Sequence, residues 1–131
     1  MSAAVFSSVR GSWAGLVEVL RVCRQLPVVE GNRRRIGLHG AVARSRRLGA
    51  LNPVRPERDR RRLQRAISLV DRCLPGGGNC VRRALLEMAL DGGAAGETFH
   101  AGLRSEGGPR SGHAWLASHE TRERYDAVIS I

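Results

Sequence analysis

Apolar residues recur at helical spacing in residues 80–90, directly after the turn sequence Pro75-Gly76-Gly77-Gly78. The period of 3.6 residues is typical of an amphipathic helix. We expect Asn79 to cap this helix, because its side chain can accept a hydrogen bond from a free N–H of the first turn. Glycines 92 and 93 follow and predict the end of the helix. The apolar stripe comprises Val81, Ala84, Leu85, Met88 and Ala89, and the polar face comprises Arg82, Arg83 and Glu87.

Three other stretches also show helical periodicity. Residues 12–25 carry an apolar stripe with Trp13 as a packing anchor, and Leu26-Pro27 should end that helix, because proline lacks the amide proton. Residues 41–51 predict a short helix, and residues 57–73 predict a longer one with a stripe of Leu63, Ala66, Ile67 and Val70. The two prolines of residues 52–56 predict a loop. We therefore divide the chain into a helical, arginine-rich region, 1–56, and a core, 57–131.

The last third of the chain alternates apolar and polar residues as strands do. We predict strands at residues 97–104, 111–117 and 124–131, joined in sequence as an antiparallel meander. In the simplest hairpin, with a turn at His119-Glu120, His113 lies opposite Asp126, with Cβ atoms about 5 Å apart. The predicted fold class is α+β, with N-terminal helices followed by a helix packed on a small antiparallel sheet.

Cys80 lies in the first turn of its predicted helix, where the helix dipole stabilises a thiolate. Free N–H groups at the same place could hold an oxyanion, with Asn79 or Gln64 as a second donor. His113 is the candidate general base, with His100 as its competitor, and Asp126 is the candidate orienting acid. Trp115 either walls the cleft or packs in the core. The plain alternative is that Cys80 is a small buried residue, as we expect for Cys73.

The composition narrows the setting of this chemistry. The net charge of +10 is carried by arginine, since the chain contains no lysine. This charge favours anionic partners, although codon bias also explains the choice of arginine. Three cysteines do not form a disulfide framework, and we expect a reducing cytoplasmic setting. Neither a secretory signal nor a membrane-spanning run is visible. We expect no metal, no cofactor and no membrane partner.

The sequences Asn-Cys-Val-Arg-Arg-Ala-Leu at 79–85 and Gly-His-Ala-Trp-Leu at 112–116 resemble the leader peptidases of lasso-peptide biosynthesis, within the transglutaminase-like cysteine proteases. The resemblance implies a transglutaminase-like or papain-like core. It also implies a bacterial peptidase that removes the leader from a ribosomally made precursor peptide. Cys80 would be its nucleophile, His113 its base and Asp126 the orienting acid. The implied partners are the precursor peptide, a leader-recognition protein and an ATP-dependent macrolactam cyclase.

The arginines also support a different class of function. Residues 33–47 and 58–65 could form a non-catalytic module that binds nucleic acid or an acidic partner protein. However, we find no nucleic-acid-binding fold signature, and only 4% of the residues are aromatic, which is few for base stacking. We therefore expect the arginines to dock a peptide or a protein. The sequence leaves hydrolysis and acyl transfer open, because they differ only in the second nucleophile.

Overall fold

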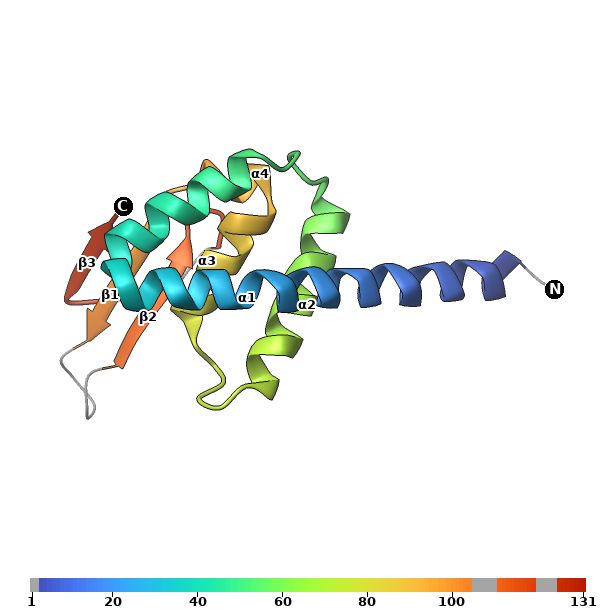
Figure 1. The fold of residues 1–131 in the computed structure, drawn as a ribbon, viewed down its shortest axis with the longest axis horizontal. Coiled ribbons are helices and arrows are strands. Elements are labelled where there is room, and N and C mark those ends of the chain that lie inside the picture. Colours follow the sequence, from blue (N-terminus) through green and yellow to red (C-terminus); the bar gives the residue numbers. More distant parts are fainter. Residues whose placement is uncertain (1–2, 105–110, 120–124) are drawn as a thin grey trace.

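The computed structural model describes residues 3–104, 111–119 and 125–131, which form helices followed by a three-stranded sheet (Figure 1). The α+β prediction is confirmed. Helix α2 has the bounds that the sequence pattern predicted, and α3 begins at Cys80 as expected. The elements are α1 (Ala3–Ala50), α2 (Glu57–Cys73), α3 (Cys80–Leu90), α4 (Gly92–Ala95), β1 (Phe99–Arg104), β2 (Ser111–Leu116) and β3 (Ala127–Ser130).

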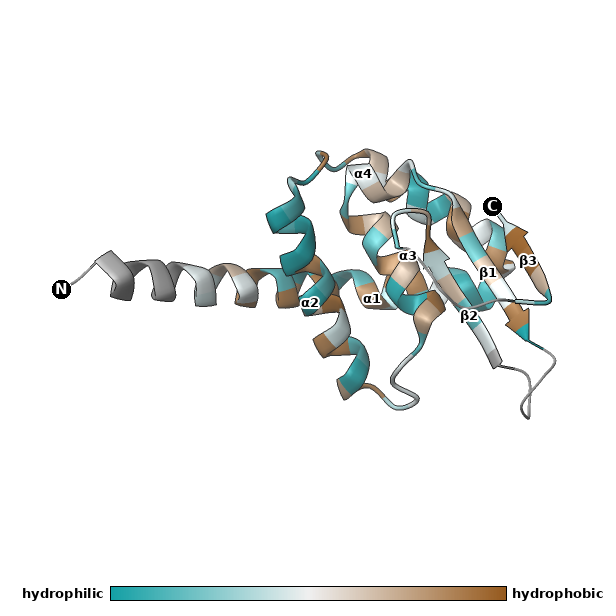
Figure 2. Ribbon diagram, turned by 180° about the vertical axis from the view of Figure 1, so that it is seen from behind, coloured by the Kyte–Doolittle hydropathy of each residue, from teal (hydrophilic) through white to brown (hydrophobic). Residues whose placement is uncertain are grey.

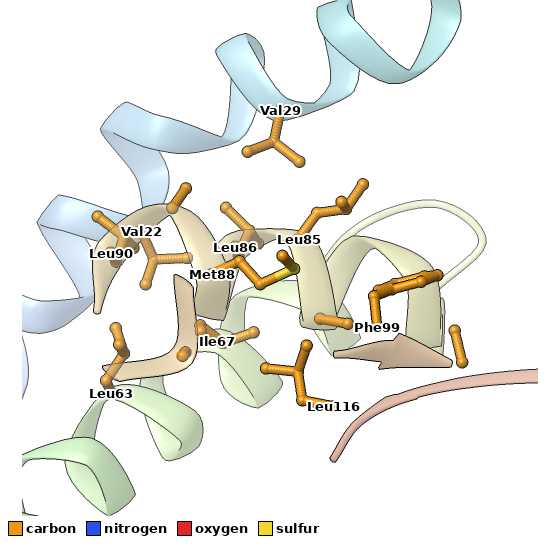
Figure 3. Packing of buried hydrophobic residues seen from close by; sticks show 14 of the residues in the cluster. Val22, Val29, Leu63, Ile67, Leu85, Leu86, Met88, Leu90, Phe99 and Leu116 are labelled. Carbon is orange, nitrogen blue, oxygen red and sulfur yellow. The ribbon is translucent and has the colours of Figure 1, made fainter. Parts of the chain in front are cut away.

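Helix α3 lies at the centre of the molecule, between α1, α2 and the sheet (Figure 1). Every residue from Ala84 to Leu90 is buried, so both the predicted apolar stripe and the residues beside it meet neighbours. Burying one such leucine fully contributes about 1.5–3 kcal/mol. Figure 3 shows how the side chains of α3 pack against the surrounding elements. Around Leu85, Leu86 and Met88 lie Val22, Val29, Leu63, Ile67, Phe99 and Leu116.

Helix α1 differs most from expectation. The prediction that Leu26-Pro27 ends a helix is wrong, because α1 continues through Pro27. Val22 and Val29, on either side of the proline, are both buried in the core, and this packing outweighs the lost backbone hydrogen bond. The real break is at Gly37, whose φ of 73° few other residues adopt. There the chain turns back, and α1 becomes two arms that form a V (Figure 1).

The prediction of which face of the first arm of α1, before Gly37, meets the core is also wrong. Trp13 is 67% exposed, so it does not act as the predicted packing anchor of the core. Leu16 and Leu20 are exposed beside it, whereas the core contacts come from Val22 and Val29. Cys73, expected to be buried, is exposed at the end of α2. In each case the apolar pattern identified a helix but did not identify which side of it meets the core.

The sheet has the strand order β2-β1-β3, with both pairs antiparallel. The three strands exist, but the predicted meander is wrong, because β3 pairs with β1 and not with β2. The core face of the sheet carries Phe99, Ala114 and Leu116, all buried. Strand β2 is therefore an edge strand, and the start of α3 lies against it.

The loop predicted at residues 52–56 is present between α1 and α2. Helix α3 ends at Leu90, just before the glycines at 92 and 93 as predicted, and the single turn of α4 follows. Asp91 caps α4, and its carboxylate accepts the N–H groups of Gly93 and Ala94. Helix α1 packs on both α2 and α3 across the proposed division at residue 56, which remains a prediction. In the described part of the chain, no helix is long and apolar enough to cross a membrane.

Candidate active site

Cys80 opens onto a cavity of about 320 Å³ between α2, α3 and β2. It is the first residue of α3, and Asn79 caps the helix by accepting the N–H of Arg82 at 3.0 Å. The N–H of Ala114 on the edge strand donates to the Cys80 Sγ at 3.2 Å. This bond fixes the sulfur beside the strand that carries His113. The cavity is lined by Gln64, Ile67, Ser68, Cys80, Arg83, Ala84, Glu87, His113, Ala114, Trp115, Leu116 and His119.

An ion cluster under the first turn of α3 holds Cys80 in place. Arg82 donates to Asp71 of α2 at 3.0 Å and to Glu30 of α1 at 2.7 Å. Asp71, only 1% exposed, also accepts the N–H of Gly78 at 3.0 Å. Arg82, which the pattern placed on the polar face, is therefore buried, and its guanidinium pairs with the buried Asp71 and the half-buried Glu30. The cluster joins three helices and the glycine-rich turn.

His113 and Trp115 point away from the core, on the outer face of β2. Their rings stack with centroids 5.8 Å apart, and Tyr125 stacks on both, at 6.4 Å from His113 and 5.2 Å from Trp115. Gly102 of β1 makes room for this cluster, because a Cβ there would lie 2.5 Å from the Tyr125 ring. Trp115 thus both lines the Cys80 cavity and supports the His113 ring.

Asp126 does not have the predicted relation to His113. The cross-strand partner of His113 is Gly102, because β1 lies between β2 and β3, so the proposed hairpin register is wrong. Asp126 is exposed just before β3, and its N–H donates to the carbonyl of Leu103 at 3.0 Å. Its neighbour Tyr125 stacks on the His113 ring, so this segment lies close to the candidate base. The His119-Glu120 turn falls partly outside the described residues.

A second histidine and a carboxylate, which sequence reasoning missed, also line the cavity. The Nε2 atom of His119 lies 3.1 Å from Glu87 Oε2. Burial raises the pKa of Glu87, but hydrogen bonds from His119, Gln64 and Arg60 lower it more, so the net pKa is lowered. The bond to Glu87 raises the pKa of His119 despite its partial burial. The pair therefore favours a carboxylate and an imidazolium at one end of the cavity.

Of the other residues predicted for the site, Gln64 lines the cavity, whereas Asn79 and His100 do not. The amide of Gln64 donates to Glu87 at 2.8 Å. The side-chain oxygen of Asn79 serves the helix cap, as expected. His100, the competing base, lies on β1 2.8 Å from the Ser130 Oγ and does not line the cavity. Among the residues that the structure describes, no group of three or more His, Cys, Asp or Glu side chains could hold a metal ion.

One signal in the sequence could have revealed Glu87. It follows Cys80 by seven residues, or two helical turns, so both side chains project from the same face of α3. The sequence pattern placed Glu87 on the polar face of the helix, although the face containing Cys80 had to meet the sheet. No comparable signal identifies His119, whose position depends on how the chain leaves β2.

The comparisons with known proteins agree with this geometry at the level of the family. The sequence matches the profile of the Transglutaminase-like superfamily over residues 23–123. Searches of curated proteins and of solved structures gave no match. Proteins of this superfamily are typically cysteine-peptidase-like, and the domain suggests an enzyme of the cysteine-protease type. With most of its length matched, and with a cysteine at a helix start beside a histidine-bearing strand, the chain belongs to the transglutaminase-like superfamily.

Proposed function

We propose that the protein is a cysteine peptidase that removes the leader from a ribosomally made precursor peptide during lasso-peptide maturation. Cys80 acts as the nucleophile, His113 as the general base and acid, and Asp126 as the residue that orients His113. The observation that carries this proposal is the shared cavity. Cys80 and His113 both line it, and the Ala114 N–H holds the sulfur at 3.2 Å beside the histidine strand.

The position of Cys80 supports a nucleophilic role in two further ways. A thiolate at the start of α3 is stabilised by the helix dipole. The N–H of Cys80 has no hydrogen-bond acceptor among the described residues, so it can donate to an oxyanion formed on the substrate carbonyl. Gln64 and Asn79 both remain candidates for the second donor. Gln64 lines the cavity, but its amide also donates to Glu87 at 2.8 Å, whereas the Asn79 cap uses only the side-chain oxygen and leaves the amide N–H groups to donate.

The chemistry proceeds in two steps. The Cys80 thiolate adds to the scissile carbonyl, and the tetrahedral intermediate collapses to a thioester as the His113 imidazolium protonates the departing amine. His113 then takes a proton from water, which attacks the thioester and releases the carboxylic acid and the free thiol. An amine in place of water would give acyl transfer at the same site. We favour water, because leader removal is hydrolysis.

The choice of a leader peptide as substrate rests on the motifs around the two central residues. The segments 79–85 and 112–116 resemble those of lasso-peptide leader peptidases, and here they meet at one cavity. On this proposal a leader-recognition protein presents the precursor, and an ATP-dependent cyclase consumes the released core peptide. The enzyme would act in the cytoplasm, where its three free cysteines stay reduced.

Limited alkylation tests the state of the thiol. The full chain is treated with less than one equivalent of iodoacetamide at about pH 6, where ordinary thiols react slowly. Peptide mass mapping then compares Cys80 with Cys23 and Cys73, both of which are exposed. We expect selective labelling of half-buried Cys80, lost in His113→Ala. Labelling that simply follows exposure would contradict an activated Cys80.

Cleavage tests the function itself. Precursor peptides encoded near the gene are incubated with the enzyme and the recognition protein, and the products are followed by mass spectrometry. Cys80→Ala should lower kcat by about 10⁴-fold or more, whereas Cys73→Ala should leave it unchanged. Full cleavage by Cys80→Ala would overturn the proposal. Transfer of the acyl group to an added amine, with little hydrolysis, would replace the peptidase with an acyltransferase.

A further inference from the structure

Two open hollows along α2 adjoin the Cys80 cavity. One, of about 290 Å³, shares Gln64 and Ser68 with the cavity. The other, of about 510 Å³, continues from it through Arg61 and Arg65 towards the start of the helix. A continuous furrow therefore runs along the outer side of α2 into the site of the nucleophile. Figure 2 shows that hydrophilic residues dominate α2, especially in its first turns.

Arginine is the main side chain of this furrow. We call its four exposed members, Arg58, Arg61, Arg65 and Arg72, the arginine groove. Arg61 pairs with the exposed Glu57, and Arg72 donates to the carbonyl of Ser68. Arg58 and Arg65 have no ion pair within the described residues. Positive charge along the groove is thus mostly uncompensated by the protein, unlike that of the buried arginines.

The spacing of these residues fits an extended ligand. Arg61, Arg65, Ser68 and Arg72 follow one another at three or four residues, so they form one stripe on α2. Between Arg58 and Ser68 the helix rises about 15 Å, which is the length of about four or five residues of an extended peptide. Guanidinium groups bind carboxylates through paired N–H donors. An acidic peptide segment is the ligand whose chemistry and length match the groove.

The lining of the groove does not favour nucleic acid. Among the described residues that line the two hollows, none is aromatic, and base stacking has no platform there. The rings that the structure does gather, His113, Trp115 and Tyr125, lie together on the outer face of the sheet. The carboxylates of a peptide, in contrast, can bind to the guanidinium groups without any aromatic side chain.

We propose that the arginine groove binds an acidic segment of the peptide substrate and directs the adjoining scissile bond into the Cys80 cavity. The inference rests on the proposed peptidase function for the identity of the bond that is cut. Binding by the groove can be measured without cleavage. The acidic residues should lie within about three to six residues of the scissile bond, given the length of the groove.

Fluorescence anisotropy tests the groove in a Cys80→Ala background, which cannot cleave. The probes are a fluorescein-labelled peptide with a block of glutamates and the same peptide with glutamines. The glutamate peptide should bind at least about tenfold more tightly, and Arg58→Glu with Arg65→Glu should remove this preference. The control pair, Arg44→Glu with Arg47→Glu, changes the net charge equally but lies on the exposed surface of α1. It should change Kd by less than about threefold.

Several outcomes would contradict the proposal that the arginine groove binds an acidic segment. Equal weakening by the two charge-reversed pairs would mean that net charge alone attracts the peptide. A single-stranded DNA oligonucleotide that binds more tightly than the glutamate peptide at the same salt, and loses affinity steeply as salt rises, would make this a nucleic-acid surface. Equal affinity of the glutamate and glutamine peptides would also refute it.

Cleavage data separate this inference from the proposed function. Groove-dependent binding in the alanine background, without cleavage by the wild-type enzyme, would support the groove and refute the peptidase. Cleavage with equal kcat/KM for acidic and neutral substrates would support the peptidase and refute the groove. If both hold, Arg58→Glu with Arg65→Glu should raise KM for acidic substrates and leave kcat and the alkylation of Cys80 unchanged.

Discussion

Two sets of arginines, which meet on α2, differ in what they contact. The inner arginines, Arg55, Arg60 and Arg82, have mostly buried side chains and each donates to carboxylates from other elements. The arginine groove, in contrast, faces solvent along α2 and makes few ion pairs within the described residues. Adjacent residues such as Arg60 and Arg61 belong to different sets. The same residue type therefore serves the structure on one side of α2 and is available to a ligand on the other.

This difference explains how a chain with a net charge of +10 and few aromatic residues holds its core together. Buried carboxylates, including Asp71, Glu87 and Asp91, are neutralised by the inner arginines or by backbone N–H groups. Those ion pairs join α1, α2 and α3 around the cavity. The charge that remains is concentrated on the outer surface, where it can attract an anion. Four measurements would sharpen or break the distinction.

Arg82→Met should have the largest effect on stability. It leaves Asp71, which is 1% exposed, and Glu30 without their shared guanidinium partner, and breaking such a buried pair costs about 3–5 kcal/mol. Urea denaturation followed by circular dichroism measures the free energy of unfolding. The comparison is Arg83→Met on the next residue, whose side chain is 40% exposed and lies 3.6 Å from Asp71, so its loss should cost much less. A loss below about 1 kcal/mol for Arg82→Met would mean that the cluster is not structural.

Arg60→Met should have the next largest effect. Arg60 donates to Glu87 at 2.8 Å and to Glu97 at 2.7 Å, and its side chain is 18% exposed. Loss of charged hydrogen bonds of this kind costs about 1.5–3 kcal/mol. Arg61→Met, which removes an exposed pair with Glu57, should cost less than about 0.5 kcal/mol. Equal losses for these neighbours would contradict the division into two sets.

The Glu87–His119 pair should give stability a specific pH dependence. The raised pKa of His119 stabilises the fold fully below its unfolded value of about 6.5, and this contribution is lost as pH rises through the folded pKa. The lowered pKa of Glu87 stabilises the fold above pH about 4.3, its value in the unfolded chain. This contribution is lost as the pH falls through the pKa of Glu87 in the folded protein. His119→Gln should therefore destabilise most between these two pH values.

Urea denaturation of His119→Gln over a pH series measures that window, with exposed His39→Gln as the control. A destabilisation that is the same at every pH would show that His119 acts through packing and not through its charge. The reverse trend, with the largest loss at alkaline pH, would mean that the neutral imidazole is the form that the fold prefers.

The arginine groove should have the smallest effect on stability. Arg58→Glu with Arg65→Glu removes no ion pair found among the described residues, so the free energy of unfolding should change by less than about 0.5 kcal/mol. The same urea measurement checks this, with Arg82→Met as the positive comparison. A loss above about 1.5 kcal/mol would show that these arginines support the fold, and their proposed role in binding would have to be reassessed.

Much of the candidate site followed from local patterns. The glycine-rich turn, the Asn79 cap and the amphipathic stripe together predicted a helix beginning at Cys80, and the structure confirms that start. Alternation predicted the strand that carries His113 and Trp115 on one face. These features depend on residues close together in the sequence. Helical spacing places Glu87 on the face of Cys80 but does not show that this face meets β2, and the position of His119 depends on how the chain leaves β2.

The sequence by itself determined the helices α2 and α3, the three strands and the position of the thiol, because periodicity, caps and glycines act over a few residues. Only the tertiary structure decided that α1 passes through Pro27 and breaks at Gly37. It also decided that β3 pairs with β1, which changes the surroundings of Asp126. Finally, it separated the inner arginines from the arginine groove. Burial and long-range ion pairs depend on residues that are distant in the sequence, which a local pattern does not show. One arginine can therefore pair with a buried carboxylate while its neighbour in the sequence stays exposed to a ligand.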